Sequence, residues 1–189
     1  MPKLVLIDGH ALAYRAYFAL QTTGLSTSRG EPTHAVYGFC LMLMSVLEEE
    51  QPEYLAVTFD VGETFRHERF PAYKATRDKA PEDLHGQVER IKQVITAFGL
   101  PVLTAEGYEA DDVLGTVAHQ AEMQDVETLI VTGDRDTFQL ITPLTRVLIS
   151  VRRFSDREIY DETRVAERYG GLNPPQLVDM KGLTGDTSD

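Results

Sequence analysis

Three acidic side chains lie within four positions of the stretch GYEADDVL, residues 107–114: Glu109, Asp111 and Asp112. They precede a run, 113–121, that has the spacing of a half-buried helix. One interpretation is helix capping, because the N–H groups and the dipole at the start of a helix favour negative charge. The other is a set of ligands for a cation, and it requires acids from elsewhere in the chain to meet here.

Further acids stand at the ends of apolar runs and in two short motifs. Asp8 ends KLVLID, Asp60 ends EYLAVTFD, and the motifs GDRD and GDTSD each contain a pair. Each acid alone fits a turn, a cap or a solvated chain end. Taken together, the candidate metal ligands are Asp8, Asp60, Glu109, Asp111, Asp112, Asp134, Asp136, Asp186 and Asp189.

The charge balance supports this grouping. A net charge of −12 argues against a protein that coats nucleic acid through a basic surface. Without the nine candidates, the 30 acids fall to 21 against 18 Lys and Arg, so most of the excess acidity belongs to the proposed cluster. Carboxylates without Cys, and without His at ligand spacing, suit Mg²⁺ or Mn²⁺ better than zinc. Two such ions can activate water and stabilise the leaving oxygen of a phosphodiester.

A locally basic segment, FRHERFPAYKATRDK (65–79), follows the acid-tipped run that ends at Asp60. One interpretation is an ordinary solvated loop. The other is a segment that carries a phosphate backbone to the metal site. Lys74 and Arg77 are three residues apart, so in a helix they would share one face and grip one phosphate. Phe70 and Tyr73 would either stack on bases or only pack the loop.

Strands and helices in alternation must position these side chains. The apolar runs predict strands at 3–8, 53–60, 100–104, 127–134 and 145–150, and helices at 10–20, 34–50, 83–99, 113–121, 161–170 and 174–183. This order predicts an α/β fold with a central, mainly parallel sheet flanked by helices. In such sheets, sites form at the carboxyl ends of the strands. We therefore expect Asp8, Asp60 and Asp134 at one edge.

The whole chain, 1–189, is expected to be one domain, since its length and its 42% hydrophobic content suit a single core. Residues 61–82 form an insertion in which the apolar residues show no clear period. This insertion is called the arch segment below. Cys40 is the only cysteine, which excludes an intrachain disulfide. The sequence has no apolar run long enough to span a bilayer and no secretory signal, so we expect a cytoplasmic protein without a membrane partner.

Five ordered pieces carry a resemblance: LVLIDGHALAYRAYFAL, FDVGETFRHERFPAYKATR, GYEADDVLGTVA, TGDRDTFQL and LTGDTSD. In this order, across the whole chain, they resemble the 5′-nuclease domains of bacterial DNA polymerase I, which are relatives of flap endonucleases with a PIN-like fold. The resemblance implies that the nine acids bind Mg²⁺ or Mn²⁺, at least two ions. It also implies a helical arch, with Lys74 and Arg77 as phosphate-contacting residues at its base. The expected nucleic-acid contacts are Arg15, Arg66, Arg69, Tyr73, Lys74, Arg77 and Lys79.

The implied activity is cleavage of DNA at 5′ flaps or single-stranded 5′ ends, and of RNA primers paired to DNA. The native chain would be bacterial, nucleoid-associated and joined to a polymerase domain. One metal would be held by the first group of acids, Asp8, Asp60, Glu109, Asp111 and Asp134, and would activate water. A second would lie nearer Asp112, Asp136, Asp186 and Asp189. Lys74 and Arg77 would stabilise the charge on phosphate, and Asp134 would be indispensable.

One departure from the family concerns the end of the sequence. In the family, GDxSD is followed by Asn and a helix–hairpin–helix region that grips duplex DNA, and this region is absent here. The chain is expected to be either a fragment of a longer polymerase or nuclease, or a minimal catalytic body. Two other functions remain open: a PIN-like ribonuclease, which needs no arch, and a cation-binding module that binds nucleic acid without cleaving it.

Overall fold

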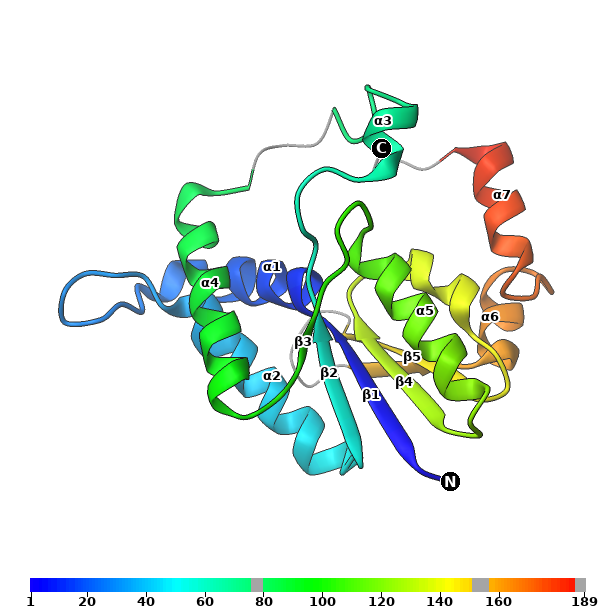
Figure 1. The fold of residues 1–189 in the computed structure, drawn as a ribbon, viewed down its shortest axis with the longest axis horizontal. Helices are drawn as coiled ribbons and strands as arrows, with labels where there is room; N and C mark the ends of the chain where they lie inside the picture. Colours follow the sequence, from blue (N-terminus) through cyan, green and yellow to red (C-terminus); the bar gives the residue numbers. More distant parts are fainter. Residues whose placement is uncertain (76–79, 151–156, 186–189) are drawn as a thin grey trace.

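The computed structural model describes residues 1–75, 80–150 and 157–185. The predictions that concern Arg77, Lys79, Asp186 and Asp189 therefore lie outside the described residues. Strands and helices alternate along the chain (Figure 1). In chain order they are β1 (Lys3–Asp8), α1 (Gly9–Leu20), η1 (Gln21–Thr23), α2 (His34–Glu50), β2 (Tyr54–Thr58), α3 (Phe65–Arg69), α4 (Glu82–Ala97), β3 (Val102–Leu103), α5 (Ala110–Glu122), β4 (Glu127–Thr132), η2 (Arg135–Leu140), β5 (Thr145–Ser150), β6 (Arg157–Tyr160), α6 (Glu162–Arg168) and α7 (Gln176–Thr184).

Within the described residues, the strands form one six-stranded sheet in the order β3-β2-β1-β4-β5-β6. The neighbours from β3 to β5 are parallel, and β6 runs antiparallel to β5. The central strand β1 is apolar on both faces, since helices cover the sheet on both sides. This confirms the predicted α/β fold with a mainly parallel sheet.

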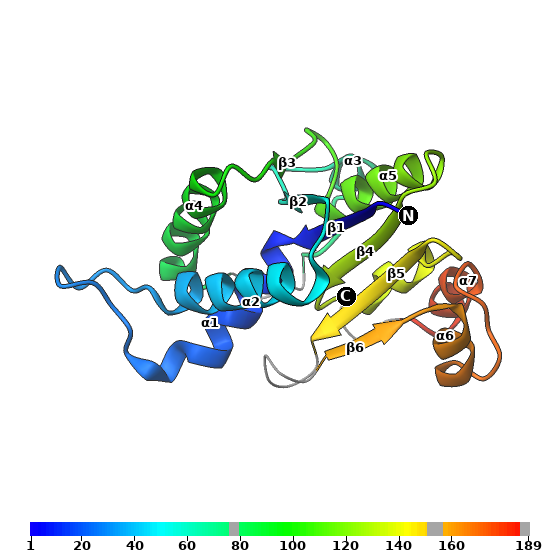
Figure 2. The same ribbon diagram turned by 90° about the horizontal axis from the view of Figure 1, so that it is seen from below.

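Two layers of helices enclose the sheet (Figures 1 and 2). Val5 and Ile7 of β1 pack into a core with α1, α2 and α4, where Phe39 is fully buried. Leu4 and Leu6 point to the other face and pack into a core with α5 and η2, where Leu114 is fully buried. The period of two along β1 therefore sends alternate side chains into the two cores.

The chain changes direction across the sheet at β1. After β1 it builds β2 and β3 on one side, and then α5 carries it back to β4 on the other side of β1. A crevice outside the carboxyl ends of the strands forms at such a switch point, and ligands of open α/β sheets bind there. Asp8 is the last residue of β1, and Asp134 follows β4 by two residues.

The tight passage from β1 into α1 depends on Gly9. A Cβ atom at this position would lie 2.4 Å from Cζ of the buried Phe59 ring. Without that atom, the helix begins directly after Asp8, whose Oδ1 accepts a hydrogen bond from the N–H of Ala11 at 2.9 Å. Asp8 is therefore both the end of a strand and the cap of a helix.

Several predicted boundaries are wrong. The strands expected to include Asp60 and Asp134 end at Thr58 and Thr132, so these acids lie in the loops that follow. The helix expected from residue 113 begins at Ala110. The sequence patterns also missed β6, whose four residues show no clear alternation between apolar and polar side chains.

The arch segment differs in part from the expected helical arch. In its described residues, 61–75 and 80–82, the helical stretch within the insertion is the short α3, which precedes Lys74. Lys74 has a left-handed backbone with φ +56°, so it sits in a turn and cannot share a helical face as predicted. A turn still allows its side chain to reach the acids.

No helix among the described residues is both long enough and apolar enough to cross a membrane.

Candidate active site

Asp8 is the most enclosed of the candidate acids, with 5% of its surface exposed. Burial raises the pKa of this carboxyl to about 6, although the N–H of Ala11 and the hydroxyl of Thr132 both donate to it and lower that value. Asp60 and Asp134 raise it further through their negative charge. The three strand-end acids therefore lie near one another at one edge of the sheet, as predicted.

Asp111, in the first turn of α5, lies beside the same acids. Burial raises the pKa of this half-buried carboxyl to about 7, and the charges of Asp8, Asp134, Asp60 and Glu109 raise it as well. The five acids proposed to share one metal thus feel each other's charge. Like charges this close favour protonation or the binding of a cation.

Thr132 links two of these acids through one hydroxyl group. Its Oγ1 donates to Oδ2 of Asp8 at 2.8 Å and accepts from the backbone N–H of Asp134 at 3.0 Å. The side chain is fully buried at the end of β4. Asp134 in turn begins η2, where its Oδ1 accepts from the N–H of Asp136 at 2.8 Å.

Asp60 faces α5 from the loop after β2. Its Oδ1 accepts from the N–H of Ala110 at 2.6 Å, and its own N–H donates to Nδ1 of His10 at 3.1 Å. Burial lowers the pKa of His10, which suits an imidazole that accepts this bond. Asp60 thereby ties the start of α5 to the end of β2.

Side chains of the arch segment contact Glu109, the N-cap of α5. Nζ of Lys74 lies 2.7 Å from Oε1, and the hydroxyl of Tyr73 donates to Oε2 at 3.2 Å. Nη1 of Arg66 is 3.9 Å from the same Oε2. Three of the predicted nucleic-acid contacts therefore lie directly above the acid cluster.

Asp112 points to Arg66 rather than to the first group of acids. Two hydrogen bonds of 2.7 and 2.8 Å join the guanidinium to its carboxylate, and these bonds hold the pKa of Asp112 below its ordinary value. Asp112 also accepts the N–H of Glu109 at 2.9 Å, so it completes the cap of α5. The capping interpretation is correct for this motif, and it does not conflict with a second role.

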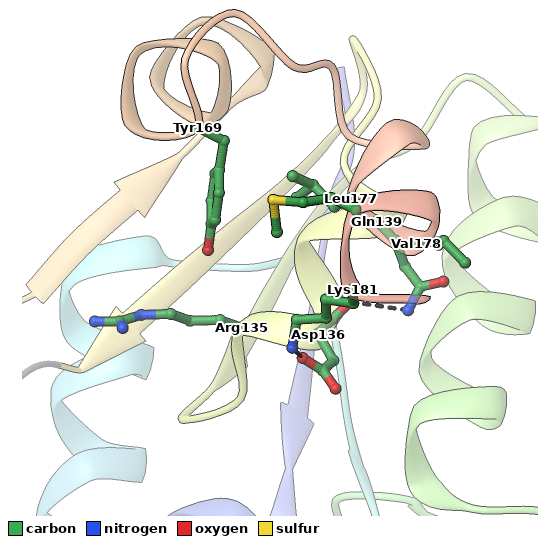
Figure 3. A pocket seen from close by; sticks show the side chains of 8 residues that line it. Arg135, Asp136, Gln139, Tyr169, Leu177, Val178 and Lys181 are labelled. Atoms are coloured by element: carbon green, nitrogen blue, oxygen red, sulfur yellow. Dashed lines mark hydrogen bonds and ion pairs between the residues drawn. The ribbon is translucent and has the colours of Figure 1, made fainter. Parts of the chain in front are cut away.

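Asp136 lies farther along η2 and forms an ion pair with Lys181 of α7 (Figure 3). The two side chains border a cavity of about 130 Å³ between η2, α7 and Tyr169. Asp112 and Asp136 are thus each held by a basic side chain, as is Glu109 of the first group, whereas Asp8 and Asp111 lie beside other acids.

A divalent cation such as Mg²⁺ needs several oxygen ligands that converge on one point. In residues 1–75, 80–150 and 157–185, no three Asp, Glu, His or Cys side chains lie close enough together to hold an ion as they stand. The carboxylates of Asp60, Glu109 and Asp112 are instead turned toward protein donors. The donor set still fits Mg²⁺ or Mn²⁺ by its chemistry, because it offers hard carboxylate oxygens, and around Asp8 and Asp111 these negative charges repel one another.

Two further predicted contacts, Arg15 and Arg69, lie within the described residues. Arg15 on α1 is half-buried, and burial lowers the pKa of its guanidinium. Arg69 is exposed at the end of α3, with Cζ 5.4 Å from the centroid of the Phe65 ring. Neither side chain pairs with an acid within the described part of the chain, so both remain available to an anionic ligand.

Two residues of this site escaped the sequence patterns. Thr132 lies inside the predicted strand 127–134, and His10 is the first residue of the predicted helix 10–20. The signal for Thr132 was its place directly before the Gly133–Asp134 turn. No signal marked His10, because its contact with Asp60 arises only when β2 pairs with β1.

The chain belongs to the family of the 5′-3′ exonuclease, N-terminal resolvase-like domain, whose model matches residues 3–170. Among its relatives, a DNA polymerase I of Chloroflexus aurantiacus is 53% identical over 190 residues, which cover 100% of this chain and 20% of the relative. A DNA polymerase I of Bacillus subtilis is 46% identical over 188 residues, covering 99% and 21%. The chain thus spans about a fifth of the length of these relatives.

Solved structures confirm the fold. The T5 D15 protein co-crystallised with metal ions superposes with a TM-score of 0.77 at 21% identity, covering 99% of this chain and 68% of that one. A complex of the T5 D15 flap endonuclease with DNA and metal ions gives 0.72 at 19% identity, with the same coverage. The expected resemblance to 5′-nuclease domains is therefore confirmed.

Proposed function

We propose that this chain is a metal-dependent 5′ nuclease that hydrolyses phosphodiester bonds of DNA at 5′ flaps and single-stranded 5′ ends. The observation that carries the proposal is the meeting of five carboxylates at the switch point of the sheet, directly beneath Lys74, Arg66 and Tyr73. Family membership supports it, as does the match to polymerases five times as long. Such relatives favour a polymerase domain on the native chain, and a bacterial cytoplasmic location.

The proposed ligands fall into two groups with different surroundings. The first group is Asp8, Asp60, Glu109, Asp111 and Asp134, and the second includes Asp112 and Asp136, with Asp186 and Asp189 outside the described residues. A bound divalent ion would supply a water of lowered pKa and neutralise charge on the reacting phosphate. Asp136 is paired with Lys181, whereas Asp8 and Asp111 face other acids, and this difference supports two ions, either Mg²⁺ or Mn²⁺.

The side chains of this chain have distinct tasks in the proposed reaction. Asp8 and Asp134 are fixed by Thr132, so their positions at the strand ends are set before any ligand arrives. Lys74 and Arg66, now held by Glu109 and Asp112, are placed to exchange these carboxylates for phosphate oxygens of the substrate. Arg77 is proposed to act beside Lys74, and Arg15, Arg69, Tyr73 and Lys79 to hold the strand on either side.

A flap-cleavage assay tests this function. A 5′-labelled DNA flap is incubated with the chain and Mg²⁺, Mn²⁺ or EDTA. We expect a short labelled product with either metal and none with EDTA. A flap with an RNA 5′ arm, assayed in parallel, distinguishes a ribonuclease. Metal-dependent cleavage of the RNA arm alone would refute the proposal, and binding of both flaps without cleavage would support the non-catalytic module.

A further inference from the structure

A cleft of about 630 Å³ lies along the outer face of α5, between the arch segment and η2. This volume is in the range of small-molecule binding sites. Glu109, Asp111, Asp112 and Asp136 line it, so the cleft is continuous with the acid cluster. The three strand-end acids are not among its lining residues, so the proposed reaction leaves most of this cleft unused.

Two aromatic residues, Phe65 and Tyr108, also line the cleft. The centroids of Phe65 and Tyr108 are 5.6 Å apart, with the ring planes inclined by 56°. The N–H of Phe65 donates to the carbonyl of Gly107 at 2.9 Å, and that of Tyr108 to Ala105 at 3.2 Å. The pair is therefore held by its backbone, although 52% of Tyr108 is exposed. The exposed part of this ring is therefore accessible to a ligand.

Phe65 and Tyr108 are each followed in the sequence by a charged residue of the site. Tyr108 immediately precedes Glu109, and Phe65 immediately precedes Arg66, which binds Asp112. Adjacent Cα atoms are about 3.8 Å apart, so a nucleotide whose phosphate meets the acids has its own base within reach of the rings.

Several other lining side chains are able to form hydrogen bonds, among them Thr116, His119 and Gln139. Thr116 and Gln139 already donate to the backbone carbonyls of Asp112 and Asp136. The imidazole of His119 makes no hydrogen bond with the described residues, although it lines the cleft. Because the acids of this cleft outnumber its one cation, Arg66, a second phosphate would be repelled here, whereas a neutral base would not.

We propose that this cleft is a nucleobase subsite. It takes the base of an unpaired nucleotide next to the bond that is cleaved, stacked on Tyr108. The Phe65 ring is already covered by the guanidinium of Arg66, whose Cζ lies 4.6 Å from the ring centroid. Stacking on an aromatic face accepts every base, so the subsite selects for an unpaired base and not for a sequence. This inference rests on the proposed function, since it places the phosphate of the same nucleotide at the acids.

The subsite is tested by combining a substitution in the protein with the removal of bases from the DNA and by measuring the binding affinity of each pair. Flap affinity is measured by fluorescence anisotropy with Ca²⁺, for an intact flap and for one lacking the two bases that flank the cleavage position. Tyr108→Ala should weaken binding of the intact flap about tenfold, the scale of one base–aromatic stack. On the abasic flap the same variant should bind like the unmodified protein. Tyr108→Phe should keep the affinity, and Tyr108→Leu, which keeps the bulk, should lose it.

Tyr37→Ala is the matched control, because Tyr37 on α2 is equally exposed and does not line the cleft. It should leave both affinities unchanged. Equal weakening by Tyr108→Ala on the intact and abasic flaps, or no weakening on either, would overturn the subsite. Binding in Ca²⁺ does not depend on cleavage, so a base-dependent loss without cleavage in Mg²⁺ would support the subsite and contradict the proposed nuclease function.

Discussion

At the scale of single residues, one buried hydroxyl holds two of the proposed ligands in place. Thr132→Val keeps the shape of the side chain but removes the donor to Asp8 and the acceptor for Asp134. Partners that orient metal ligands commonly contribute about 10–100-fold to metal affinity. We therefore expect Thr132→Val to weaken Mn²⁺ binding by at least about tenfold in titration calorimetry, and Thr132→Ser to retain it.

The same strand provides the control for Thr132. Thr128 is also buried in β4, but its hydroxyl has no hydrogen-bond partner in the described residues. Thr128→Val should leave Mn²⁺ affinity unchanged and the fold no less stable, since it removes a buried group without a partner. Equal metal affinity in Thr132→Val and Thr128→Val would show that the hydroxyl of Thr132 does not position the ligands.

Crowded acids make stability depend on pH. The pKa values of Asp8 and Asp111 rise on folding, to about 6 and about 7, so the fold favours their protonated forms. Without metal, the contribution of these two groups to the free energy of unfolding should be highest below about pH 4 and should be lost as pH rises through about 6 and 7. Each pKa difference of one corresponds to about 1.4 kcal/mol, so differences of about 2 and about 3 make the loss on the order of 3–4 kcal/mol for each group.

Asp111→Asn isolates this effect. The metal-free variant should be more stable than the unmodified protein at pH 8, because a neutral amide replaces a crowded carboxylate, and nearly equal to it at pH 4. Urea unfolding at the two pH values measures both differences. A variant less stable at pH 8 would mean that Asp111 is held by attractive contacts and not by crowding.

At the scale of elements, the join between β1 and α1 sets where Asp8 lies. Gly9→Ala would bring a methyl group against the buried Phe59 ring. We expect a loss of about 1–3 kcal/mol in the free energy of unfolding, the usual cost of overpacking. The control is Gly86→Ala in α4, where an added Cβ meets nothing within 4 Å. It should gain about 0.5–1 kcal/mol. Equal effects of both substitutions on urea unfolding would contradict this packing argument.

Much of this element order could be predicted, because buried parallel strands are continuous apolar runs. KLVLID and ETLIVT show this clearly, and both strands form. The acids after them were found from their place at the strand ends. Strand β6 could not be found, because its pairing with β5 creates the strand. The turn at Lys74 likewise follows from its contact with Glu109, which no local pattern encodes.

At the scale of the whole molecule, the fold arranges acidic and basic side chains in a way that composition alone does not reveal. The net charge of −12 gives no sign of a nucleic-acid ligand. The fold nevertheless gathers acids at the switch point and sets Arg66 and Lys74 over them. Since relatives are about five times as long, the remaining parts of such chains are expected to add grip on the duplex.

The measurement that tests the metal-dependent chemistry most directly compares Asp134→Ala with the unmodified chain. The initial rate of flap cleavage is recorded over a range of Mn²⁺ concentrations, and thermal unfolding confirms that the variant is folded. We expect the variant to stay folded and to cleave nothing at any Mn²⁺ concentration, while the unmodified chain cleaves in proportion to bound metal. Mn²⁺-dependent cleavage by the pure variant at a comparable rate would contradict the assignment of the acid cluster as the catalytic centre.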